Sequence, residues 1–124
     1  MAERPALRVA QIVRGDVVEV DLEPTIGSEI RKTRRCVVVQ NDVGNKYSPL
    51  TIVVPATGAE NVTKIFPVCV PVSKGEGGFT KDAVILCDQV RSIDKRRIAR
   101  SCGRLPMSLM EKVDSALKIS LGLK

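Results

Sequence analysis

The chain has 124 residues, of which 44% are hydrophobic, and its 20 Lys and Arg residues outnumber 14 Asp and Glu, giving a net charge of +6. This size and composition predict one compact domain that can bury a core without disulfides or a structural metal. The longest apolar run, Ala83 to Cys87, is far too short to span a membrane, and the charged N-terminus lacks the apolar stretch of a signal peptide. We therefore expect a cytoplasmic protein with no membrane partner.

The first predicted strand begins after Arg14-Gly15-Asp16, where Val18, Val20 and Leu22 alternate with acidic residues as in a half-buried strand. Pro24 is expected to end this strand. Residues 23–35 contain turn formers followed by concentrated positive charge, which predicts an exposed loop. This loop is the most basic short window of the chain.

Further strands are predicted by β-branched runs at Cys36–Val39 and Ile52–Val54, joined by a turn-rich connection, with the second strand ending near Pro55. Val68–Val70 and Ala83–Leu86 are two more candidate strands, and the glycine-rich segment between them predicts a mobile loop. Several short strands at close spacing indicate a small barrel.

The C-terminal third changes character, because residues 91–104 contain six basic residues against one acid. A short helix and its exit are expected here, and three interpretations of the charge stay open: solvated surface, contact with RNA phosphates, or docking of an acidic partner. After Pro106 a clear helix is predicted, with Ser108 and Glu111 as a capping box. One face of this helix is apolar and faces either the core or a dimer: Leu109, Met110, Val113, Ala116, Leu117 and Leu121.

Several kinds of site are excluded by the sequence. It contains no His, which removes the commonest general acid or base near neutral pH, and no phosphate-binding or dinucleotide-binding glycine motif. Its four cysteines form no C-x-x-C pair, so we expect free thiols at Cys36, Cys69, Cys87 and Cys102. With only three aromatic residues, extensive base stacking is not expected either. After these exclusions, the remaining candidate for a functional site is a cluster of basic side chains beside hydroxyl groups.

The order of several short motifs carries more information than any one of them alone. Read together, they make the chain resemble the MazF/PemK-like toxins from about Arg14 to Leu121: Arg14-Gly15-Asp16-Val17, Gly27-Ser28-Glu29, Arg34, Pro55-Ala56-Thr57 and Cys87-Asp88-Gln89-Val90-Arg91-Ser92-Ile93-Asp94. We accordingly expect residues 1–13 to be an N-terminal extension and residues 14–124 to form a single domain.

The resemblance implies a mainly β fold with some α, namely a small SH3-like β-barrel with a C-terminal helix. It also implies the toxin of a type II toxin–antitoxin pair, a sequence-specific endoribonuclease that needs no metal or other cofactor. Such a toxin would cleave single-stranded RNA as a homodimer and would be inhibited by a cognate antitoxin with an acidic tail. Two alternatives are a CcdB-like toxin directed at gyrase and a nucleic-acid-binding module on the same fold.

The resemblance further implies which residues act. Arg34 and Thr57 match the catalytic pair, and Ser28 matches a loop position near the scissile phosphate. The RNA 2′-hydroxyl would attack the adjacent phosphate while Arg34 stabilises the developing charge and Thr57 positions an oxygen, with Glu29 or Asp88 as the proton acceptor. RNA-binding residues are expected at Glu29, Arg31, Lys32, Arg35, Asp88 and Arg91.

Four positions depart from the family pattern. Arg35 replaces a proline that usually follows the catalytic arginine, Arg31 and Lys32 replace glycines, and Leu86 replaces an arginine that some members pair with the Asp at position 88. Each candidate site residue could instead have a purely structural role. Arg34 would be solvated, Thr57 and Ser28 would close turns, and Asp88 with Arg91 would form a structural pair.

Overall fold

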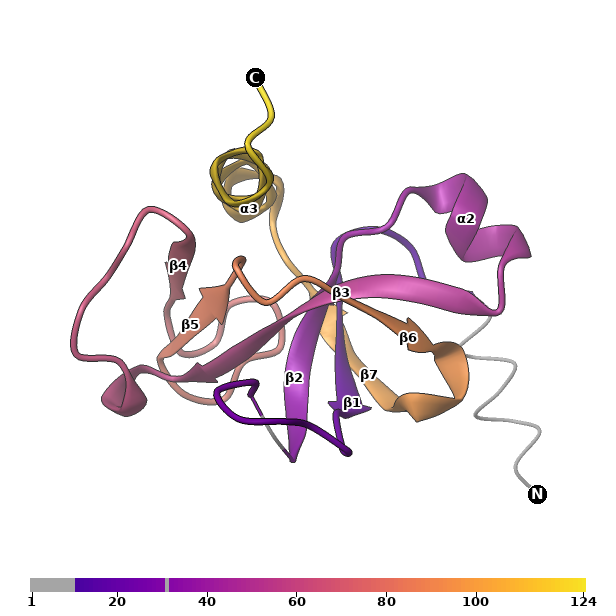
Figure 1. The fold of residues 1–124 in the computed structure, drawn as a ribbon, viewed down its shortest axis with the longest axis horizontal. Coiled ribbons are helices and arrows are strands. Elements are labelled where there is room, and N and C mark those ends of the chain that lie inside the picture. The colour runs from indigo at the N-terminus through magenta and orange to yellow at the C-terminus, as the bar shows by residue number, and fades with distance from the viewer. Residues whose placement is uncertain (1–10, 31) are drawn as a thin grey trace.

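The computed structural model describes residues 11–30 and 32–124, so the predicted RNA-binding residue Arg31 and most of the predicted N-terminal extension lie outside the described residues. In the described part, an antiparallel sheet curls into a small barrel beside two helices, α2 (Asp42–Tyr47) and α3 (Met107–Leu121) (Figure 1). The strands are β1 (Asp16–Asp21), β2 (Thr33–Val38), β3 (Leu50–Gly58), β4 (Cys69–Val72), β5 (Ala83–Leu86), β6 (Arg91–Asp94) and β7 (Ile98–Arg104). Short 3-10 helices, η1 (Ala59–Asn61) and η2 (Lys95–Arg97), follow β3 and β6. The predicted mainly β fold with a C-terminal helix is confirmed.

The long strand β3 changes its neighbour part-way along its length. The strand order is β4-β5-β3-β2-β1-β7, and β6 also pairs with β3. β3 pairs with β2 up to Pro55, opposite Cys36, and with β5 from Ala56 onward. The prediction that this strand ends near Pro55 was wrong, because a proline without an N–H is tolerated where a strand exchanges partners. β2 and β3 therefore diverge beyond this point and leave an opening between them.

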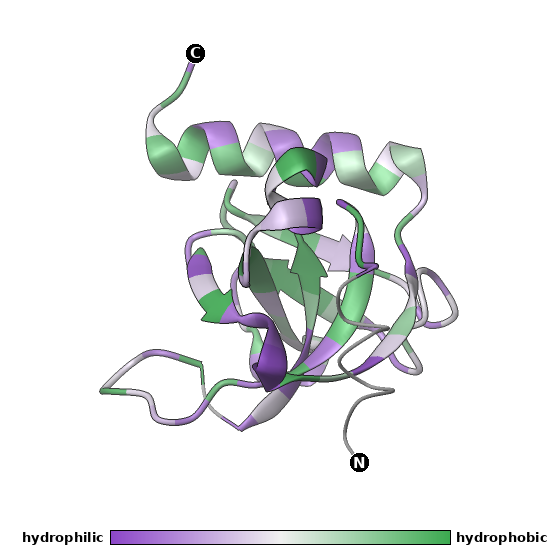
Figure 2. Ribbon diagram, turned by 90° about the vertical axis from the view of Figure 1, so that its right-hand side faces the viewer, coloured by the Kyte–Doolittle hydropathy of each residue, from purple (hydrophilic) through white to green (hydrophobic). Residues whose placement is uncertain are grey.

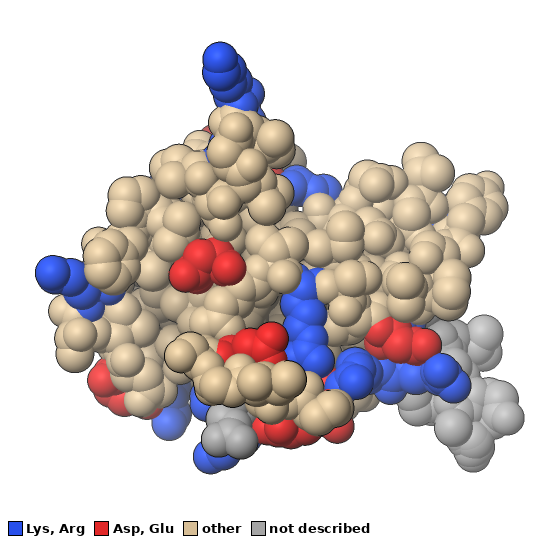
Figure 3. Space-filling view, in the orientation of Figure 1, with Lys and Arg blue, Asp and Glu red and all other residues tan. Residues whose placement is uncertain are grey.

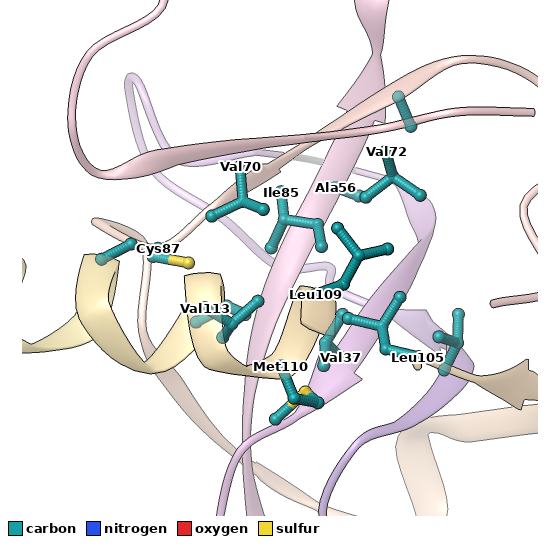
Figure 4. Packing of buried hydrophobic residues seen from close by; sticks show 14 of the residues in the cluster. Val37, Ala56, Val70, Val72, Ile85, Cys87, Leu105, Leu109, Met110 and Val113 are labelled. Carbon is teal, nitrogen blue, oxygen red and sulfur yellow. The ribbon is translucent and has the colours of Figure 1, made fainter. Parts of the chain in front are cut away.

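The sheet buries apolar side chains on both faces. Alternate residues of a strand point to opposite faces, so neighbours such as Val53 and Val54 belong to two separate clusters. One cluster, which contains Val54, packs under α3 and includes Val37, Ile85, Leu109 and Val113, which Figure 4 labels. The other cluster lies on the opposite face, and Ile30 of the β1–β2 loop packs against it. Its buried members are Ile12, Val18, Val20, Leu22, Cys36, Val38, Val53, Ile93 and Ile98.

Helix α3 runs across one end of the barrel, while the β1–β2 loop projects from the barrel away from it (Figure 2). Five of the six predicted apolar positions of α3 are buried, but Leu121 is 55% exposed because the last turn extends past the core. The predicted capping box is absent, since Pro106 is the N-cap, without a side-chain hydrogen bond, and Ser108 already lies in the first turn. Among the described helices, none combines the length and apolar character that a membrane span requires.

The Arg14-Gly15-Asp16 motif is structural. Arg14 Nη2 donates to Asp114 Oδ1 of α3 at 2.5 Å, and its Nε donates to the carbonyl of Val39 at 2.8 Å. Asp16 accepts hydrogen bonds from the backbone N–H of Val13 and from Arg104 Nε, both at 2.9 Å. The motif therefore links the start of β1 to α3 and to β7.

Backbone contact closes the barrel between the loop after β4 and strand β7. A Cβ atom added to Gly78 would lie 2.2 Å from the carbonyl oxygen of Cys102, and one added to Gly103 would lie 2.8 Å from that of Gly77. Both glycines also have positive φ angles, 88° and 156°. Only glycine allows this approach without displacing the backbone.

Residues 91–104 form strands rather than the predicted helix. Ile93 and Ile98 are buried in register with β3 and β1, and only the three residues of η2 are helical. Asp94 caps this short turn by accepting from the N–H of Arg96 at 2.8 Å. The helix prediction was wrong because strand pairing on both sides of the turn outweighs local propensity.

The six basic residues of this segment hold the chain together, a role that the charge pattern did not indicate. Each donates to an acceptor in another part of the fold or at the adjoining turn: Arg91 to the carbonyl of Leu22, Lys95 to that of Asn45, Arg96 to Asp94, Arg97 to the carbonyls of Asp21 and Glu23, Arg100 to Glu19, and Arg104 to Asp16. The connection between β2 and β3 also differs from the prediction, since it contains α2, whose N-cap Asn41 accepts from the N–H of Gly44 at 2.8 Å.

All four cysteines are free, as predicted, but they differ in burial. Burial raises the pKa of the Cys36 thiol to about 12 and that of the Cys87 thiol to about 12, whereas Cys69 and Cys102 are half-buried. Because the thiolate is the reactive form, we expect only Cys69 and Cys102 to react rapidly with a disulfide reagent such as Ellman's reagent at pH 8. Rapid labelling of all four thiols in the native protein would contradict this burial.

Candidate active site

The opening between β2 and β3 forms a pocket of about 260 Å³ that contains both predicted catalytic residues, Arg34 and Thr57. They lie two residues beyond the last β2–β3 pair, Cys36 with Pro55, one on each strand. Alternation of side chains places both residues on the same face of the sheet. The change of partner along β3 therefore brings a guanidinium and a hydroxyl together across a gap.

Two further cations line the same pocket. Arg35 follows Arg34 on β2, opposite Glu19 of β1, and Lys81 comes from the loop that precedes β5. The Nε of Arg35 is buried and has no hydrogen-bond partner among the described residues. Together with Arg34, these cations make the pocket suited to an anion such as a phosphate.

Three carboxylates also line this pocket, and two of them are engaged elsewhere. Glu19 Oε1 lies 3.3 Å from Arg100 Nε, and Asp82 Oδ1 accepts from the N–H of Lys74 at 2.8 Å. For Glu60 the described part of the chain offers no partner. Its carboxylate lies over Gly58, because a Cβ atom added there would come within 2.5 Å of Glu60 Oε1. Glu60 is thus the pocket carboxylate that is available to accept a proton.

Helix η1 supports Thr57 directly. Asn61 Nδ2 donates to Thr57 Oγ1 at 3.1 Å, so the hydroxyl oxygen is already an acceptor and its hydrogen can point to another group. The sequence analysis did not single out Asn61, Glu60 or Lys81. The four-residue spacing from Thr57 to Asn61 was the available signal, but it depends on a turn that the chain shows only when folded.

A second pocket of about 390 Å³ adjoins the first and shares Thr57 and Asn61 with it. Ser28 of the β1–β2 loop and Asp88 of the turn after β5 line this second pocket. The structure therefore places both residues in a pocket beside the cationic one.

The other predicted RNA-binding residues lie farther along the β1–β2 loop. Glu29 and Arg91 line a third hollow of about 730 Å³, together with Ser28 and Asp88. Glu29 Oε1 accepts from the N–H of Ile26 at 2.6 Å and so closes a turn of the loop. The predicted pair of Asp88 with Arg91 does not form within the described chain, because Arg91 Nη1 donates to the carbonyl of Leu22 at 2.7 Å. Arg91 therefore has a structural role and fixes the base of the β1–β2 loop.

The base of this loop is fixed by further contacts. Gln89 Oε1 accepts from the N–H of Ile30 at 2.8 Å, and Arg97 donates to the carbonyls of Asp21 and Glu23. Lys32, another predicted RNA-binding residue, is exposed and has a φ of 71°. Its backbone N–H donates to Glu23 Oε2 at 2.9 Å, so its side chain is free to reach solvent while its backbone is held.

The family model of PemK-like, MazF-like toxins of type II toxin–antitoxin systems matches residues 13–121. The chain belongs to this family. The predicted resemblance is confirmed, and the match covers nearly the whole of the MazF-like domain predicted from residue 14 onward.

Solved structures similar to this MazF-like chain include MazF from Deinococcus radiodurans, with 26% identity, a TM-score of 0.77, and coverage of 90% of this chain and 97% of that one. An endoribonuclease in complex with its cognate antitoxin from a mycobacterial species has 19% identity and a TM-score of 0.74, over 91% and 97% of the two chains. The Mycobacterium tuberculosis toxin MazF-mt6 has 18% identity and a TM-score of 0.71, over 88% and 98%. This likeness confirms the predicted SH3-like barrel of MazF-like proteins.

The predicted departures from the family pattern can now be placed in this MazF-like chain. Arg35 lies in the same pocket as Arg34 and adds a second guanidinium there. Leu86 is half-buried and lines the second pocket, so the arginine partner that some members give to Asp88 is replaced by an apolar wall. No group of three or more His, Cys, Asp and Glu side chains in residues 11–30 and 32–124 is arranged to hold a metal ion.

Proposed function

We propose that this toxin is a metal-independent endoribonuclease that cleaves single-stranded RNA by attack of a 2′-hydroxyl on the adjacent phosphate. The observation that carries the proposal is the pocket between β2 and β3, which Arg34, Arg35 and Lys81 line together with Thr57. Guanidinium groups match the geometry of phosphate oxygens, and this reaction builds negative charge on those oxygens.

Each pocket residue has a role in this reaction. The 2′-oxygen forms a bond to phosphorus while the bond from phosphorus to the 5′-oxygen breaks, and the leaving 5′-oxygen takes a proton from water. The products are a 2′,3′-cyclic phosphate and a 5′-hydroxyl. Arg34 stabilises the charge on the non-bridging oxygens, and Arg35, which lines the same pocket, adds a second positive charge. The Thr57 hydroxyl, held by Asn61, donates to a phosphate oxygen.

The proton of the 2′-hydroxyl needs an acceptor, and we assign this step to Glu60. It shares the pocket with Arg34 and Thr57, and its carboxylate lies over Gly58. Glu29, an acceptor predicted from the sequence, lines the third hollow and bonds within its own loop, and Asp88 lies in the adjoining pocket. Ser28, which lines the adjoining pocket with Thr57, contacts the RNA strand next to the reacting phosphate.

An antitoxin with an acidic segment is the proposed inhibitor. The net charge of +6 and the cationic pocket favour a partner that presents carboxylates where the RNA presents phosphates. The similar mycobacterial endoribonuclease is in complex with its cognate antitoxin, which supports a partner of this kind. The homodimer, the RNA substrate and the acidic tail all stay predictions for this chain.

The test is incubation of the purified protein with a long single-stranded RNA in EDTA, followed by mapping of the cuts and of the product ends. We expect discrete cuts that leave 2′,3′-cyclic phosphates and 5′-hydroxyls, because the attacking group belongs to the RNA itself. Heat-denatured protein taken through the same purification is the control for contaminating nuclease. Intact RNA with folded protein would contradict the proposal and would favour the gyrase-directed toxin or the binding module.

A further inference from the structure

We propose that the second pocket, beside Thr57, binds a guanine base of the RNA next to the cleaved bond. The inference rests on the proposed function and adds a base preference to it. The pocket holds about 390 Å³, and its lining combines an exposed aromatic ring, apolar walls and a few polar side chains. Single-stranded RNA is recognised in this way, by stacking of a splayed base and hydrogen bonding to its edge.

The stacking surface is Phe66, in the loop between β3 and β4. Its side chain is 54% exposed, and Lys64 Nζ lies 6.0 Å from the centre of the ring. Of the other two aromatic residues, Phe79 is buried in the core, and Tyr47 belongs to α2, which lies on the opposite side of the barrel from β4 and β5 (Figure 1). The site therefore offers one aromatic platform, which suits one base.

The polar edge of the pocket comes from the turn after β5. Gln89 Oε1 already accepts from the N–H of Ile30, so the group that Gln89 can offer a ligand is the Nε2 donor. Asp88, its neighbour, is exposed, and its carboxylate has no partner within residues 11–30 and 32–124. The turn thus presents two acceptor oxygens and an amide donor.

This set of groups matches one base. Guanine carries two adjacent donors, N1–H and N2–H₂, followed by the O6 acceptor, so a carboxylate can accept twice while an amide donates to O6. Adenine, cytosine and uracil each place an acceptor next to their donor on this edge, and that acceptor would face a carboxylate oxygen. The complementarity therefore favours guanine over the other three bases.

The surroundings of the pocket favour a base rather than a phosphate. Of the residues that line it, only Lys64 and Asp88 are charged, whereas on the face of the molecule in Figure 3 charged side chains gather along the lower edge, around the β1–β2 loop and β6. Thr57 lines both this pocket and the cationic one. A phosphate held beside Arg34 would thus place its neighbouring base within reach of Phe66.

The test measures binding separately from cleavage. Fluorescent 2′-fluoro oligouridines, which lack the attacking hydroxyl, carry one central G, A, C, inosine or 7-deazaguanine, and are titrated against the full chain in EDTA. We expect the G oligonucleotide to bind about 10- to 100-fold more tightly than the A or C one. Inosine, which lacks the N2 amino group, should lose much of this preference, whereas 7-deazaguanine, which keeps the whole edge, should retain it.

Two variants, each with a matched control, separate hydrogen bonding to the guanine edge from stacking of the base. Asp88→Asn should abolish the preference for G, while Glu111→Gln, an exposed change on α3, should leave it unchanged. Phe66→Ala should weaken binding of the G oligonucleotide by about tenfold or more, and Tyr47→Ala should not. Circular dichroism confirms folding of each variant.

The outcomes distinguish this inference from the proposed function. Equal affinity for all oligonucleotides, or a G preference that Asp88→Asn preserves, overturns the guanine site even if the protein cleaves RNA. A G preference that depends on Asp88 supports the site even if no RNA is cleaved, in which case the endoribonuclease proposal fails instead. When both hold, the mapped cuts should have a guanine directly beside them.

Discussion

Replacing Arg34 with alanine is expected to lower the rate of RNA cleavage by about 10²- to 10³-fold, because a preorganised donor to the developing charge is lost. Arg34 lies half-exposed near the start of β2 and is absent from both core clusters, so the fold should be retained. The measurement is the initial rate of cleavage of one defined RNA in EDTA. Arg34→Lys, which keeps the charge but loses the planar fork, should give an intermediate rate.

A control is needed because any lost positive charge weakens RNA binding in a salt-dependent manner. Arg96→Ala is suitable, since its side chain is 88% exposed and pairs with Asp94 at the far end of β6 from the pocket. It should reduce cleavage only slightly, and the reduction should disappear at saturating RNA. If Arg34→Ala cleaved as fast as Arg96→Ala at saturating RNA, the assignment of the catalytic pocket would be wrong.

Replacing Leu109 with alanine is expected to destabilise the protein by about 2–5 kcal/mol, as for other large-to-small changes in a packed core. Leu109 is buried on the inner face of α3, in the cluster that contains Val37, Val54 and Val113 (Figure 4). The lost side chain would leave a cavity between the helix and the sheet. Urea unfolding followed by circular dichroism measures the change.

The matched control is Ile119→Ala on the same helix, where the side chain is 58% exposed. It should change the free energy of unfolding far less, since it removes little buried surface. Equal destabilisation by the two substitutions would mean that the outer face of α3 is also buried in solution, as in a dimer.

The pattern of apolar residues in the sequence correctly predicted the strands and helices that bury one continuous apolar run or one apolar face. The strand at Ala83–Leu86 and the helix after Pro106 are found as expected, because five consecutive apolar residues and a helical apolar stripe each have one good way to be buried. Residues 91–104 were assigned wrongly, since their basic side chains conceal the buried Ile93 and Ile98 and their acceptors lie in distant segments.

In the candidate site too, some residues could be predicted from the sequence and others depend on contacts between distant segments. The order of the motifs identified Arg34 and Thr57 as the predicted catalytic pair, and the structure brings both residues into one pocket. The order of motifs did not identify Glu60, Asn61 or Lys81, because they line that pocket only where β3 exchanges β2 for β5. Nor could it show that Arg91 holds the carbonyl of Leu22 rather than Asp88.

The two faces of the sheet have a consequence for how far the β1–β2 loop can vary. Helix α3 and its cluster lie on one face, whereas the β1–β2 loop contacts the other face through Ile30 and is tied at its base by Arg91, Arg97 and Gln89. Exchange of the loop tip for that of another toxin would leave the packing under the helix untouched. The barrel can therefore serve as a common scaffold for chimeric proteins that differ in the tip of this loop and keep the same anchoring residues.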